Sequence, residues 1–115
     1  MNRAQRGAAA EAMAAEFLRS RGLAVTVRNY RCRLGEIDLI ARHGDTVVFV
    51  EVRLRSSAAF GGAAASIGAS KRLRMSRAAR HYLSTLDGEP PCRFDAILLD
   101  ALDPARIEWL EGIEL

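Results

Sequence analysis

The residues best suited to chemistry lie close together, in the segment GEIDLIARHGDTVVFVEVR at 35–53. Its apolar pattern predicts two strands joined by a turn. Residues two apart in a strand share a face, so Glu36 lies beside Asp38 on the first strand. By the same rule Glu51 lies beside Arg53 on the second strand. Carboxylates and a cation at this spacing could bind a metal ion or a phosphate group, provided that the two faces coincide.

The turn decides whether the two acidic faces coincide. A two-residue Gly44-Asp45 turn is a favoured hairpin type, and it pairs residues whose numbers sum to 89. Asp38 then lies directly opposite Glu51, with Cβ atoms about 5 Å apart. A turn at His43-Gly44 would move the register by two and keep the faces together. A three-residue turn would send Glu51 to the other face.

Two opposed carboxylates repel each other, on the order of a few kcal/mol in a partly buried site. A raised pKa on one acid, a neighbouring cation or a bound metal would relieve this repulsion. Asp38, Glu51 and a backbone carbonyl such as that of Val52 would suit one or two Mg²⁺ or Mn²⁺ ions, with waters completing the octahedron. Such an ion could activate a water and neutralise charge on a phosphodiester. The alternative is a solvated strand face, on which the acids pair with Arg53 and Arg31.

Other elements must hold this hairpin in place. Apolar residues at helical spacing predict helices over 3–21 and 70–86. Alternating and β-branched runs predict strands at 24–30, 36–42, 46–53, 93–99 and 106–111. The order αβββαβ(β) predicts an α/β fold with a mixed central sheet flanked by helices, because a helix between two strands is typical of a parallel crossover. The chain, 1–115, is expected to form one domain.

Composition limits the class of protein. Half of the residues are hydrophobic and 27% are charged, as in an ordinary globular protein. The sequence has no apolar run near the roughly 18 residues that span a bilayer. Glu11 and Glu16 interrupt the Ala-rich N-terminus, which is unlike a signal peptide, so we expect a cytoplasmic protein that binds no membrane. Cys32 and Cys92 are expected to be free thiols. The segment 56–69, rich in Ser, Ala and Gly, is expected to be a mobile loop.

Positive charge is concentrated before residue 87. Residues 1–86 carry 15 Lys/Arg against 6 Asp/Glu, whereas residues 87–115 carry 2 against 8. A basic body with an acidic end is compatible with nucleic-acid binding, although ordinary solvated surfaces carry similar charges. Cations flanking the acids and on the second helix could contact phosphates without reading sequence. These cations are Arg31, Arg33, Arg55, Lys71, Arg74 and Arg77.

The same residues carry a resemblance to a known family. Over nearly its whole length the chain resembles the YraN-type family of small bacterial proteins. The resemblance lies in the order of its segments, which are GEIDLIA, a hairpin, FVEVR, a flexible loop, a basic helix and RFD at 93–95. That family is similar to archaeal Holliday junction resolvases of the PD-(D/E)xK nuclease superfamily. The resemblance implies a restriction-endonuclease-like fold, DNA as substrate (branched DNA included), Mg²⁺-dependent phosphodiester cleavage and, by analogy, a homodimer. It assigns the metal-binding acids to Asp38 and Glu51. Glu11 and Glu36 would be further acids of the site.

Arg53 departs from the family pattern, which has a lysine there that is thought to orient the attacking water. Arginine keeps the charge but is planar, bulkier and effectively never deprotonated. The chain has 16 Arg and a single Lys, Lys71, so the change could reflect codon usage with function retained. A nuclease that has weakened or lost activity but still binds nucleic acid is the second hypothesis. Compensation by Lys71, near the start of the second helix, is the third.

Three functions therefore remain open from the sequence. The first is a Mg²⁺-dependent endonuclease-like protein acting on DNA. The second is a non-catalytic nucleic-acid-binding module with the same fold. The third is a protein-interaction domain whose acidic C-terminal segment binds a partner.

Overall fold

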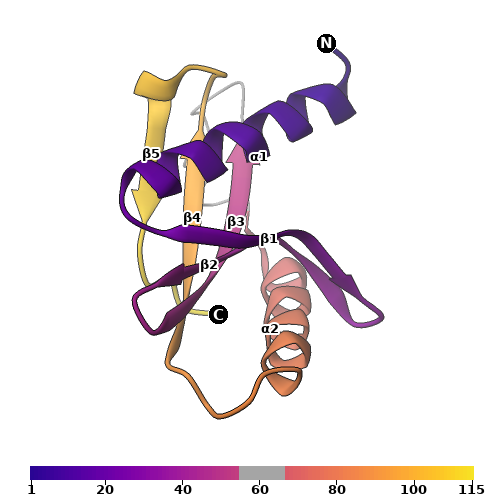
Figure 1. Cartoon of the computed structure of the whole chain (residues 1–115). Coiled ribbons are helices and arrows are strands. Elements are labelled where there is room, and N and C mark those ends of the chain that lie inside the picture. Colours follow the sequence, from indigo (N-terminus) through magenta and orange to yellow (C-terminus); the bar gives the residue numbers. More distant parts are fainter. Residues whose placement is uncertain (55–66) are drawn as a thin grey trace.

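The computed structural model describes residues 1–54 and 67–115 (Figure 1). Most of the loop expected at 56–69 lies outside the described residues, as does Arg55. The α/β fold class and the predicted element order are confirmed, and every predicted boundary lies within two residues of the observed one. The elements are α1 (Arg3–Ser20), β1 (Ala24–Cys32), β2 (Gly35–His43), β3 (Thr46–Leu54), α2 (Ala69–Ser84), β4 (Cys92–Leu99), the 3-10 helix η3 (Pro104–Arg106) and β5 (Ile107–Leu110).

Within the described ranges, five strands form one mixed sheet in the order β1-β2-β3-β4-β5. Among these described strand pairs only β3–β4 is parallel, and α2 lies between its two strands in the chain. The helices cover opposite faces: Val48 and Val50 of β3 pack with α1, whereas Val47 and Phe49 pack with α2. Burial on both faces explains why β3 is apolar over consecutive positions. Neither helix of the described ranges is long and apolar enough to cross a membrane.

The β2–β3 hairpin has the predicted turn. Its first pair is His43 with Thr46, and the same register continues to Leu39 with Val50. Gly44 has a φ of 61°, which suits the first central residue of a type II′ turn and which glycine adopts without strain. The turn at Gly44-Asp45 is therefore confirmed, together with the register that brings the two acids to the same end of the hairpin.

Strand β2 changes face at Asp38. Ile37 and Ile40 both pack on the α2 side, whereas Leu39 packs on the α1 side. Strict alternation would put residues 37 and 39 on one face, so the regular alternation that the sequence predicts for this strand is wrong at Asp38. Asn29, which lies between the β1 residues that pair with Leu39 and Ile37, has a left-handed φ of 53°. The two strands are therefore distorted together at the acidic residue.

A buried carboxylate holds the C-terminal strand. Asp95 of β4 is fully buried and accepts hydrogen bonds from Arg93 Nε at 3.1 Å, Trp109 Nε1 at 3.0 Å and the Gly112 amide at 3.0 Å. Because buried carboxylates require such partners, Asp95 ties β5 and the following turn to β4. The RFD segment at 93–95 thus stabilises the fold through the hydrogen bonds of Asp95.

Gly35 lies where the start of β2 touches α2. A Cβ atom at this position would lie 2.2 Å from the carbonyl oxygen of Arg74, so a larger residue cannot fit without moving the helix. This contact fixes the first turns of α2, which carry Lys71, against the hairpin.

Replacing Gly35 with alanine should therefore destabilise the protein by about 1–3 kcal/mol, because α2 must shift to admit the methyl group. Gly7→Ala is the matched control: its Cβ would meet no atom of residues 1–54 or 67–115 within 4 Å, and alanine favours the helix by up to about 1 kcal/mol. Chemical denaturation measures both changes. Equal effects of the two substitutions would show that the close approach at Gly35 does not affect the free energy of unfolding.

Candidate functional site

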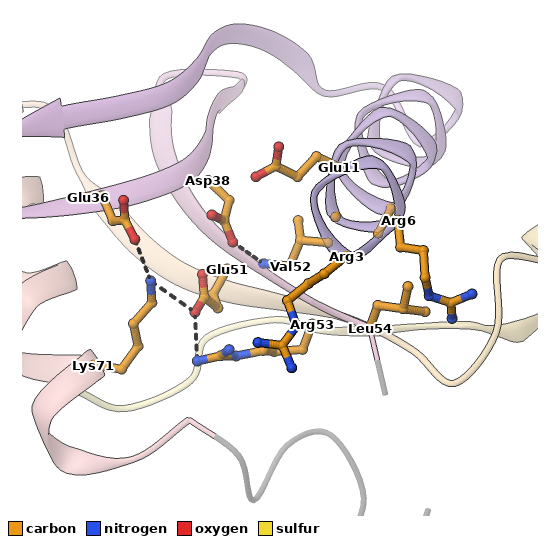
Figure 2. A pocket seen from close by; sticks show the side chains of 12 residues that line it. Arg3, Arg6, Glu11, Glu36, Asp38, Glu51, Val52, Arg53, Leu54 and Lys71 are labelled. Atoms are coloured by element: carbon orange, nitrogen blue, oxygen red, sulfur yellow. Dashed lines mark hydrogen bonds and ion pairs between the residues drawn. The ribbon is translucent and has the colours of Figure 1, made fainter. Parts of the chain in front are cut away.

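The acidic residues line one pocket between α1, β2, β3 and the start of α2 (Figure 2). Its volume is about 850 Å³. All five residues that the sequence predicted for catalysis lie in its wall, together with three further cations. The charged lining consists of Arg3, Arg6, Glu11, Glu36, Asp38, Glu51, Arg53 and Lys71.

Glu51 is the buried centre of this pocket, with only 1% of the residue exposed. Its Oε2 lies 3.3 Å from Arg53 Nη2 and 3.5 Å from Lys71 Nζ. Its Oε1 is buried and has no hydrogen-bond partner among the described residues. A buried carboxylate oxygen without a partner is costly, so Oε1 is suited to carry a proton or to bind a cation.

Asp38 is half-buried and lies between buried Glu51 and half-buried Glu11. One of its oxygens accepts a hydrogen bond from the Val52 amide at 2.8 Å, beyond the last β2–β3 pair. The negative charge of Asp38 also acts on both neighbouring acids, Glu51 on one side and Glu11 on the other. The Asn29 amide nitrogen reaches the Glu11 carboxylate at 3.0 Å in the side-chain orientation that satisfies both groups.

Burial and charge repulsion change the ionisation of this cluster. Burial first, and then the hydrogen bond and negative charge of Asp38, raise the pKa of Glu51 to about 8, against the opposing effect of Lys71 and Arg53. Burial and the charge of Asp38 also raise the pKa of Glu11 above its ordinary value. At neutral pH the metal-free cluster therefore retains a proton that it would release to a divalent cation.

Lys71 reaches the acids from the first turn of α2. Its side chain is only 13% exposed, and Nζ lies 3.5 Å from both Glu36 Oε1 and Glu51 Oε2 (Figure 2). Two roles for Lys71 were predicted from sequence: a phosphate contact of the helix, or compensation for Arg53. The observed position is inside the acidic pocket, beside the carboxylate that Arg53 also contacts.

Sequence reasoning missed two cations of the pocket, Arg3 and Arg6. The capping box between Asn2 and Gln5 starts α1 just before them, so both belong to its first turns. The sequence carried only a weak signal for them: Arg3 and Arg6 are three residues apart and so lie on one side of the helix, but Arg6 is not at i,i+3 or i,i+4 spacing from Glu11. They add positive charge to the rim of a pocket whose interior is acidic.

The remaining predicted phosphate contacts are divided among different places. Arg31 lies 3.7 Å from Glu36, and it lines a second hollow of about 270 Å³ with Arg33 and Arg74. Arg77 is exposed on α2, outside the linings of both hollows. Arg55 lies outside the described residues. The cations therefore surround the acids on several sides and do not form a single stripe along α2.

The donor set fits a magnesium ion only if water supplies most of the ligands. In residues 1–54 and 67–115 no three Asp, Glu, His or Cys side chains form a metal-binding group. Mg²⁺ commonly takes one or two carboxylates and keeps several waters. Asp38 and Glu51 satisfy that requirement, and the unpartnered Oε1 of Glu51 is the oxygen most available to an ion.

Comparison with known proteins identifies the family. Residues 10–99 match the family described as "Uncharacterised protein family UPF0102". The chain belongs to the UPF0102 family. This bears out the resemblance to the YraN-type family, and the matched span includes the pocket acids from Glu11 to Glu51, together with Arg53 and Lys71.

Individual UPF0102 proteins are similar over almost the whole chain. UPF0102 protein NE0711 of Nitrosomonas europaea is 58% identical, over 93% of this chain and 91% of that protein. The UPF0102 protein of Methylobacillus flagellatus is 56% identical, over 93% and 94%. UPF0102 protein RALTA_A3032 of Cupriavidus taiwanensis is 58% identical, over 96% and 82%.

The raised pKa of Glu51 predicts how stability depends on pH. Folding moves this pKa from its ordinary value of 4.5 to about 8, so across that window the folded state holds a proton that the unfolded state has lost. Stability without metal should therefore fall as pH rises from 4.5 to 8. Glu51→Gln mimics the protonated acid. In EDTA the free energy of unfolding of this variant should match that of the wild type within about 1 kcal/mol at pH 5. At pH 8.5 it should exceed the wild-type value by roughly a few kcal/mol.

Denaturant unfolding at several pH values measures this difference. Glu108→Gln is the matched control, because Glu108 is an exposed carboxylate on β5. Parallel pH profiles for wild type and Glu51→Gln would contradict the assignment of a retained proton to Glu51.

Proposed function

We propose that this UPF0102 chain is a Mg²⁺-dependent endonuclease-like protein that binds and cleaves DNA. One observation carries the proposal: the carboxylates of Asp38 and Glu51 adjoin each other in a cation-flanked pocket, and one buried oxygen of Glu51 has no partner in the described structure. A carboxyl pair in such a place can release its retained proton to a divalent cation that binds between the two groups.

Phosphodiester hydrolysis assigns a role to each residue. Water loses a proton as its oxygen adds to phosphorus, the bond from phosphorus to the leaving sugar oxygen breaks, and that oxygen takes up a proton. Asp38 and Glu51 would hold the ion, which when bound supplies Lewis acidity toward the phosphate and lowers the pKa of a water. Glu11, next to Asp38, would accept a proton or bind a further water. Arg3 and Arg6 at the rim would attract the DNA backbone.

The geometry favours Lys71 as the functional partner of Arg53. Both cations reach Glu51 Oε2, but from different elements, β3 and α2. The ammonium of Lys71 is a compact point charge that can hold a water or a phosphate oxygen, as the lysine of the family pattern is thought to do. Arg53 has a buried Nε without a partner in the described structure, so its guanidinium keeps a donor for a ligand.

A non-catalytic nucleic-acid-binding module is the second candidate. It is favoured by the same two ion pairs, because Arg53 and Lys71 already balance the charge of Glu51 without a metal. In that case the pocket would be a structural ion network, and the surrounding arginines would bind phosphates. The two candidates differ in metal binding and in cleavage.

A cleavage assay separates them. Wild-type protein with Mg²⁺ or Mn²⁺ should cut linear, gapped or branched DNA, and EDTA should stop the reaction. Asp38→Asn should lower the rate by at least about 100-fold while DNA binding persists. Asp45→Asn, in the exposed hairpin turn, is the matched control and should leave the rate unchanged. Binding without cleavage in every metal would favour the non-catalytic module.

Two further variants in the same assay test the cations. Lys71→Ala should reduce cleavage by roughly 100-fold if Lys71 replaces the missing lysine. Arg53→Lys should retain activity or increase it. Arg80→Ala, which removes an exposed cation from the same helix, controls for net charge. Wild-type cleavage by Lys71→Ala would remove Lys71 from the catalytic group.

A further inference from the structure

We propose that the tip of the β1–β2 hairpin, residues 31–35, is a wedge that recognises a distorted DNA duplex by inserting Leu34 between base pairs. This inference deepens the proposed function and rests on it, because it assumes that the acidic pocket takes DNA. It names a substrate class, duplexes with a gap, a branch or a kink, and a residue that would select it.

The tip presents an apolar side chain at a projecting position. Cys32 pairs with Gly35, so Arg33 and Leu34 are the two turn residues of the hairpin. Figure 1 shows this hairpin extending beyond the sheet beside α2. Leu34 is 51% exposed. A single exposed leucine is ordinary on a protein surface, but here it occupies the end of a projecting hairpin.

The tip is held firmly, as a wedge must be. Gly35 packs directly against the Arg74 carbonyl of α2, where even a methyl group would collide. This contact seats the start of β2 directly on α2, next to the two turn residues. A side chain on such a support can enter a base stack without first losing much conformational freedom.

The charges around Leu34 favour DNA as the occupant. Arg31, Arg33 and Arg74 line the hollow at the tip with Leu34, and the side chain of Arg31 is 74% exposed. Arginines at this spacing can hold phosphates on both sides of an inserted apolar residue, an arrangement used by proteins that kink DNA. Glu36 lines both this hollow and the acidic pocket, so the two surfaces are continuous.

The wedge implies a preference for DNA that is already distorted. Insertion requires two base pairs to unstack, and this costs least where a gap, a branch or a flexible step has weakened the stack. DNA held at the tip would continue into the acidic pocket along Glu36. An apolar tip could instead bind another protein, and the experiment below includes that outcome.

The test measures binding by fluorescence anisotropy in EDTA, which prevents cleavage. Wild-type protein should bind a gapped or four-way duplex more tightly than a linear duplex of equal length. Leu34→Ala should lower affinity for the distorted DNA by about tenfold, with less than a twofold change for linear duplex. Leu34→Met, which keeps a long apolar side chain, should retain the preference.

Leu73→Ala is the matched control. Leu73 is 50% exposed on α2, in a different hollow that also contains Leu115, so its loss should change neither affinity. A second signal comes from 2-aminopurine placed beside the gap. Its fluorescence should rise on binding of wild type and Leu73→Ala, and should rise less with Leu34→Ala, because unstacking brightens this base.

The outcomes distinguish this inference from the proposed function. If Leu34→Ala keeps the wild-type preference and the full 2-aminopurine signal while metal-dependent cleavage persists, the wedge is wrong and the nuclease proposal stands. If wild type binds no DNA of any form, both fail. If Leu34→Ala abolishes capture of a protein but changes no DNA affinity, the tip is a protein contact and the wedge is overturned.

Discussion

The closeness of two carboxylates inside the protein is the constraint around which this molecule is arranged. Asp38 and Glu51 come from different strands and meet where the β2–β3 pairing ends, so the sheet itself cannot separate them. The surroundings offset part of the cost: the Val52 amide donates to Asp38, while Lys71 and Arg53 approach Glu51. One oxygen of Glu51 nevertheless has no partner among the described residues, and burial keeps its carboxyl protonated near neutral pH.

The fold explains how residues distant in sequence reach this place. The coupled distortion at Asn29 and Asp38 interrupts the regular pleat, which aims the Asp38 carboxyl at the backbone of β3. The contact of Gly35 with α2 brings the first turn of that helix, and with it Lys71, against the acids. Because α1 covers the opposite face of the sheet from α2, Glu11 completes the pocket from another direction.

Much of this arrangement could be predicted from local sequence, and the exceptions have physical causes. The Gly44-Asp45 turn fixed the register, since turn type and strand pattern are local properties. The change of face at Asp38 could not be predicted, because it is shared with Asn29 of another strand. The position of Lys71 depends on how α2 packs on the sheet, which helical periodicity does not specify.

A crystal structure with bound Mn²⁺, with anomalous differences recorded at the manganese edge, tests the central claim most directly. If the carboxylate pair is a divalent-cation site, an anomalous peak should lie between Asp38 and Glu51, within about 2.0–2.4 Å of an oxygen of each. Lys71 should then have moved away from Glu51. A structure at millimolar Mn²⁺ with no peak there, and with Lys71 still between Glu36 and Glu51, would contradict the claim.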